Sequence, residues 1–103
     1  MGKLLFDQYT YLHFASGIIA YFWGIGFWTW MIGHAVFELL ENTPIGMRAI
    51  NGTLAGIWPG GKSVPDTFKN ILGDNIGTAL GWLSAIALDR LGAHYGWYSK
   101  HIA

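Results

Sequence analysis

Residues 9–40 read YTYLHFASGIIAYFWGIGFWTWMIGHAVFELL, an apolar stretch of 32 residues with only three titratable side chains besides tyrosine. One upright membrane-spanning helix needs about 20 apolar residues, so this stretch is too long for one span and slightly short for two. The glycines of Gly24-Ile25-Gly26, near its middle, permit a tight turn. We therefore expect a short helical hairpin with helices at about 8–23 and 27–42. One long, tilted helix is the alternative.

The composition of the whole chain also favours a membrane. Of its 103 residues, 52% are hydrophobic, 17% are aromatic and only 12% are charged, with no net charge. Soluble proteins carry about 25% charged residues. The composition excludes a disordered chain, which needs high net charge, and a nucleic-acid binder, which needs a basic face. The absence of cysteine excludes disulfide and cysteine-zinc modules. The expected surroundings are a lipid bilayer.

The remaining segments complete the expected architecture. Glycines and prolines after residue 42 predict a loop over 43–65, and a third span follows at about 68–91, capped by Ser63 or Asp66. The tail, 92–103, is too short to cross and is expected to lie at the interface. The N-terminus lacks the usual features of a secretory signal and is expected to be mature. The prediction is a single all-α, polytopic membrane domain with about three spans.

Aromatic and basic side chains indicate how these spans would sit. Tryptophans gather at membrane interfaces, and the expected anchors are Trp23, Trp28, Trp30, Trp58 and Trp97. Basic residues favour the cytoplasmic side. The side with the N-terminus and the long loop holds Lys3, Arg48, Lys62 and Lys69, against Arg90 and Lys100 on the other. We therefore expect a multi-pass protein with a cytoplasmic N-terminus.

Polar residues form stripes on the expected helices. His34, Glu38 and Glu41 fall within a narrow arc of the second helix. The stripe on the third helix begins with polar residues and continues with glycines that permit close helix packing; it comprises Asp66, Asn70, Gly73, Gly77 and Gly81, with Asp74 beside it. The simplest packing sets this stripe against the second helix. The first helix adds Tyr9, His13 and Gly17 at intervals of four.

These stripes predict a polar site near one membrane face. Charge within the hydrocarbon costs about 2.5–3.5 kcal/mol per group on insertion scales, so the cluster needs a compensating partner. Carboxylates and an amide suit a hard divalent cation such as Mg²⁺. The candidate metal ligands are Glu38, Glu41, Asp66, Asn70 and Asp74. His13 and His34 are the candidate acid and base.

Three motifs in the chain resemble those of known membrane proteins. They are Asp7-x-Tyr9-x-x-x-His13, Glu38-x-x-Glu41-Asn42 and Asp66-x-x-x-Asn70-x-x-Gly73-Asp74. In this order they resemble the VanZ-like group, and more closely an uncharacterised bacterial membrane-protein family. The resemblance implies a multi-spanning protein without an assigned activity. Members usually have four or more spans, and the resemblance leads us to expect that the final ones have no counterpart in these 103 residues.

Three functions remain open on the sequence alone. The first is a small membrane enzyme or binding protein that holds a divalent cation and a polar lipid headgroup. The second is a structural or accessory subunit of a larger membrane assembly, with itself or other membrane subunits as partners. The third is an ion or proton pathway, which is least favoured because polar residues are scarce along the centre of the third span.

Overall fold

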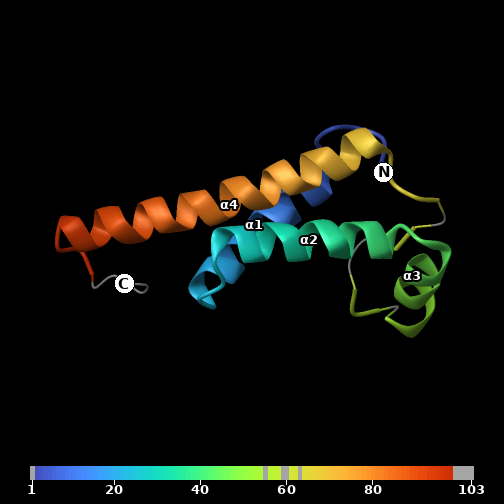
Figure 1. Cartoon of the computed structure of the whole chain (residues 1–103), viewed down its shortest axis with the longest axis horizontal. Helices are drawn as coiled ribbons and strands as arrows, with labels where there is room; N and C mark the ends of the chain where they lie inside the picture. The colour runs from blue at the N-terminus through green and yellow to red at the C-terminus, as the bar shows by residue number, and fades with distance from the viewer. Residues whose placement is uncertain (1, 55, 59–60, 63, 99–103) are drawn as a thin grey trace.

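The structure, a computed structural model, is all-helical over the residues it describes, which are 2–54, 56–58, 61–62 and 64–98. The predicted all-α class is confirmed, and no strand occurs in those ranges. The elements are α1 (Gln8–Phe22), α2 (Phe27–Glu41), α3 (Pro44–Arg48), the π-helix η1 (Ala49–Thr53) and α4 (Phe68–His94). Figure 1 shows α4 as a long rod beside the shorter α1 and α2.

The apolar stretch 9–40 forms two helices and not one. Asp7 caps α1 by accepting a hydrogen bond from the Tyr9 amide at 2.9 Å, while its own amide donates to the Thr10 hydroxyl at 2.9 Å. After α1, Gly24 adopts a φ of +81°, a left-handed conformation that favours glycine. This residue allows the chain to reverse between α1 and α2.

The connection after α2 contains more helix than a loop. Thr43 caps α3 by accepting from the Gly46 amide at 3.0 Å, and Pro44 occupies the first turn, where its missing N–H costs nothing. The residue that caps α4 is Thr67, whose hydroxyl accepts from the Asn70 amide. The expected cap Asp66 instead binds Lys62, and Ser63 lies outside the described residues.

Only α4 is long and apolar enough to cross a membrane, among the helices of the described ranges. Its 27 residues rise about 40 Å, more than the hydrocarbon core of about 30 Å. The 15 residues of α1 and of α2 each rise about 22 Å, which is short of that thickness. The tail predicted from residue 92 begins later, because α4 continues to His94; residues 99–103 lie outside the description.

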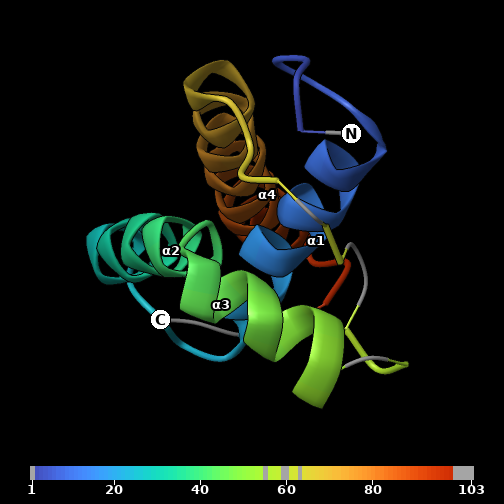
Figure 2. The same ribbon diagram turned by 90° about the vertical axis from the view of Figure 1, so that its right-hand side faces the viewer.

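The glycine stripe of α4 packs against α1 and the segment before it, which corrects the expected packing against the second helix. A Cβ at Gly81 would meet the Phe14 carbonyl oxygen, and one at Gly73 would meet that of Leu5. The closeness is mutual, since a Cβ at Gly17 would meet the Thr78 carbonyl. In the view along the bundle, α1 and α2 lie on either side of α4, and α3 lies below α1 and α2 in the picture (Figure 2). Glycine thus sets the distance between α1 and α4.

The described residues are polar inside and apolar outside. Glu38 and Thr78 are the largest side chains with essentially no exposure, whereas Leu12, Phe22 and Leu80 are among many exposed apolar residues. Thr78 joins three helices: its hydroxyl accepts from the Trp30 indole at 2.9 Å and lies 3.0 Å from that of Ser16 on α1. Soluble proteins rarely expose so much contiguous apolar surface.

The packing of α1 on α4 predicts that Gly81→Ala lowers stability. The added methyl group meets a backbone carbonyl that cannot rotate away, and overpacking of this kind costs about 1–3 kcal/mol. Gly33→Ala on α2 is the matched control, because nothing lies within 4 Å of its Cβ position. Thermal unfolding in a mild detergent measures both. Equal melting temperatures of the Gly81→Ala and Gly33→Ala proteins would contradict this packing.

Candidate functional site

The site lies beside a cavity of about 530 Å³ between α1 and α2. The two helices contribute most of the lining, α4 contributes Asn70 and Asp74, and the connection before α4 contributes Trp58, Lys62 and Asp66. Most polar lining residues come from the first half of α1, the second half of α2, the connection before α4 and the start of α4; the start of α1, the end of α2 and the start of α4 lie toward the same end of the molecule (Figure 1). The fold therefore gathers most of the predicted polar residues around a single hollow, although Glu38 is not among its lining residues.

A chain of hydrogen bonds orients the two histidines. The Asn75 amide nitrogen donates to the Ile71 carbonyl at 2.9 Å, which turns its oxygen toward His34. His34 Nδ1 lies 3.0 Å from that oxygen and must therefore carry the proton. With Nδ1 protonated, the neutral His34 ring has an acceptor at Nε2, which lies 2.8 Å from His13 Nδ1. Thus His13 Nδ1 donates.

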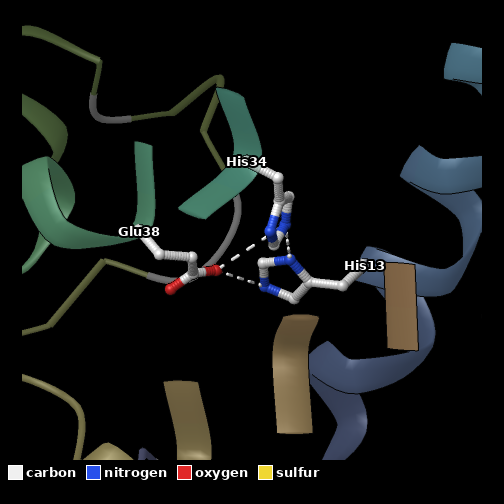
Figure 3. A group of neighbouring side chains, drawn as sticks. All are labelled: His13, His34 and Glu38. Atoms are coloured by element: carbon white, nitrogen blue, oxygen red, sulfur yellow. Dashed lines mark hydrogen bonds and ion pairs between the residues drawn. The ribbon is translucent and has the colours of Figure 1, made fainter. Parts of the chain in front are cut away.

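Because Nδ1 of His13 carries the proton, the other ring nitrogen, Nε2, does not. In a neutral imidazole whose Nδ1 carries the proton, Nε2 has only a lone pair. This atom lies 3.3 Å from Glu38 Oε1 and 3.4 Å from Asp74 Oδ2. Figure 3 shows the Glu38 carboxylate pointing at both imidazoles, with Oε1 also 3.8 Å from His34 Nε2. The lone pair of His13 on α1 therefore faces one carboxylate oxygen from α2 and one from α4.

Neither carboxylate has the hydrogen bonds that burial requires. The Glu38 side chain is 0% exposed and that of Asp74 is 3% exposed. No donor with ordinary hydrogen-bond geometry reaches either Glu38 oxygen or Oδ1 of Asp74 among the described residues, and the polar group against the Glu38 carboxyl is the carboxyl of Glu41. An unsatisfied buried acceptor costs about 1–3 kcal/mol, and more if it is charged. The cluster is stable only with a proton or a cation between its members, either a proton shared by His13 Nε2 with one of the two carboxyl groups or a cation.

A second acidic group adjoins the first. Ligand atoms of Glu38, Asp66 and Asp74 lie within 4.8 Å of one another, as do those of His13, His34 and Glu38. Lys62 Nζ neutralises the outer side, 2.7 Å from Asp66 Oδ2 and 3.8 Å from Glu41 Oε1. Glu38 thus belongs to both groups.

Two predicted ligands have structural partners instead. Asn70 is buried and donates to the Leu4 carbonyl at 2.7 Å and to Asp7 Oδ2 at 3.1 Å, tying the N-terminal segment to α4. Glu41 lies at the cavity wall beside Lys62. The predicted anchors Trp23, Trp28, Trp58 and Trp97 are exposed, whereas Trp30 turns inward to Thr78.

Sequence reasoning missed Asn75, Thr78 and Lys62. Asn75 and Thr78 lie on an apolar helix, where a polar side chain is costly and usually has a partner. That cost was the available signal, but nothing local to either residue indicates which partner it would find. Lys62 lies in the connection before α4, and only the fold brings it to Glu41 and Asp66.

The uncompensated carboxylate predicts that Glu38→Met raises the melting temperature of protein kept in EDTA. Replacing a buried ionic group by an apolar one of similar volume is often neutral or stabilising by about 1–4 kcal/mol. Asp89→Leu is the control; its buried carboxylate already accepts from the Tyr21 hydroxyl at 2.6 Å, so no gain is expected. Thermal unfolding of the three proteins is the measurement. A Glu38→Met protein that melts below the wild type would show that Glu38 is already satisfied.

The chain matches no protein-family model, no curated protein and no solved structure. The resemblance of its three motifs to VanZ-like proteins stays a prediction. The function is therefore argued from the geometry of the site.

Proposed function

We propose that this chain is a small multi-pass membrane protein that binds a divalent cation with His13, Glu38 and Asp74, beside a cavity that receives a polar lipid headgroup. The observation that carries the proposal is the lone pair of His13 Nε2 directed at two buried carboxylates, 3.3 and 3.4 Å away. A divalent cation compensates both acids at once and accepts the lone pair. A single proton does so only in part, because it neutralises one of the two carboxylates and leaves the charge of the other uncompensated.

The burial pattern supports the membrane part of this proposal. Polar groups that pair inside the bundle and apolar groups on its outside suit a lipid environment, where helices associate through small residues and hydrogen bonds. The short α1 and α2 would reach across with their tips near the interface, bounded by exposed Trp23 and Trp28. The N-terminus and the basic connection lie at one end (Figure 1), which the positive-inside rule assigns to the cytoplasm.

The ligand atoms favour an ion that accepts nitrogen as well as oxygen. Mg²⁺ prefers an octahedral shell of oxygen and keeps several waters. An imidazole with carboxylates suits Zn²⁺ or Mn²⁺ better. His34 and Asn75 would then orient His13 from behind, as residues around metal-bound histidines commonly do. The preferred ion therefore differs from the Mg²⁺ suggested by an all-oxygen set.

Calorimetric titration of purified protein with Zn²⁺, Mn²⁺ and Mg²⁺ tests the proposal. The wild type is expected to bind Zn²⁺ or Mn²⁺ more tightly than Mg²⁺, and Glu38→Gln is expected to bind none of them measurably. At a free ion concentration of 100 times Kd, binding adds about 2.7 kcal/mol of stability, which a melting curve also detects. Asp89→Asn, on the same helix as Asp74 but bonded to Tyr21, should bind as the wild type does. Equal and negligible binding by wild type and Glu38→Gln would remove the proposal.

Asn75→Leu separates a positioning role from direct ligation. Asn75 touches His34 and not the carboxylates, so its loss frees the imidazole chain to change tautomer. Loss of such a partner typically weakens metal binding about 10- to 100-fold. Ser84→Ala, on α4 and outside the cavity lining, is the control. If Asn75→Leu and Ser84→Ala bind the ion alike, the imidazole chain does not set the site.

A further inference from the structure

We propose that the cavity binds an amphiphile with an amine headgroup, whose ammonium donates to Asp74 and whose alkyl chain lies along α1. This inference goes beyond the proposed function by naming the headgroup chemistry, and it concerns the protein without a bound metal, because a divalent cation on Asp74 would repel an ammonium at the same carboxylate. It rests on the cavity lining and on the unpartnered Oδ1 of Asp74.

The lining changes from polar to apolar along one direction. On α1 the lining residues run from Tyr9 and His13, through Ser16, to Ile19. Tyr9 and Ile19 are ten positions apart, a rise of about 15 Å. Beyond the polar end the walls are mainly apolar, with Ala15, Ile19 and Trp30, while Leu12, Phe37 and Trp58 add apolar surface beside the polar side chains. A hollow of this shape fits a ligand with a polar end and an alkyl chain.

The charge of the polar end selects the headgroup. Four acids line the cavity, namely Asp7, Glu41, Asp66 and Asp74, against Lys62 as its one lysine or arginine among the described lining residues. The Lys62 ammonium is already held by Asp66 and lies beside Glu41. An anionic headgroup would therefore meet surplus negative charge. A cationic one would find it complementary.

Asp74 supplies the specific contact. Its Oδ2 faces His13, whereas Oδ1 is buried, lacks a hydrogen-bond partner among the described residues and belongs to a cavity-lining side chain. A primary ammonium carries three N–H donors and needs only one for this oxygen. A hydrogen bond between two charged groups is about twice as strong as a neutral one. Asp7 is less available, because it accepts from Tyr9 and Asn70.

Native mass spectrometry in a neutral detergent with EDTA tests the inference by competition. Equimolar dodecylamine, dodecyl phosphate and dodecanol are offered to the same protein, so that headgroup alone decides which adduct forms. We expect the wild type to bind dodecylamine in preference to the other two compounds. The abundance of the dodecylamine adduct should fall at least tenfold in Asp74→Asn and stay unchanged in Asp89→Asn. In Ala15→Trp the new side chain fills the apolar part of the cavity and leaves the acidic side chains in place. This variant should also lose dodecylamine binding.

Three results would overturn the inference. They are a dodecyl phosphate adduct more abundant than the dodecylamine adduct, equal abundance of the adducts of all three compounds, and equal dodecylamine binding by Asp74→Asn and the wild type. Because EDTA removes divalent ions, this result is separate from the metal titration. If the protein binds dodecylamine as expected but binds no metal in the calorimetric titration, only the metal proposal is rejected. If it binds the metal but shows no preference for dodecylamine, only the amine proposal is rejected.

Discussion

The close approach of α1 to α4 is the constraint on which the rest of the structure depends. Gly17, Gly73 and Gly81 let backbone lie against backbone, since a Cβ at any of them would meet a carbonyl oxygen. This contact carries His13 to Asp74 on α4, while the turn at Gly24 returns the chain so that Glu38 on α2 reaches the same place. The glycines thus determine the site although they do not touch it.

The site also explains why so few interior residues are apolar. Histidine, carboxylate, threonine and amide groups occupy the space between the helices. Thr78 on α4 links α1, α2 and α4 through its contacts with Ser16 and Trp30. In lipid, where apolar surface gains little by burial against other helices, such contacts hold a bundle together. Within the part of the chain that the structure describes, the one arrangement left incomplete is around Glu38 and Asp74. An incomplete polar group inside an otherwise satisfied bundle is the place where a ligand is expected.

Much of this was predictable from the sequence, because periodicity and turn chemistry are local. The glycines near residue 25 predict the break between α1 and α2, and the four-residue intervals place Glu38 and Asp74 on polar stripes. The partner of the glycine stripe was not predictable, since two helices competed for it and only their packing decides. The tautomer of His13 depends on Asn75, which lies 62 residues away along the chain and enters the site only through the fold.

Pulsed electron paramagnetic resonance of Mn²⁺ bound to the protein tests the central claim most directly, because it detects nitrogen coordinated to the ion. The account predicts coupling to one imidazole nitrogen in the wild type. That coupling disappears in His13→Gln and persists in His34→Gln, since His34 orients His13 and does not hold the ion. Bound Mn²⁺ without nitrogen coupling, or coupling that survives in His13→Gln, would contradict it.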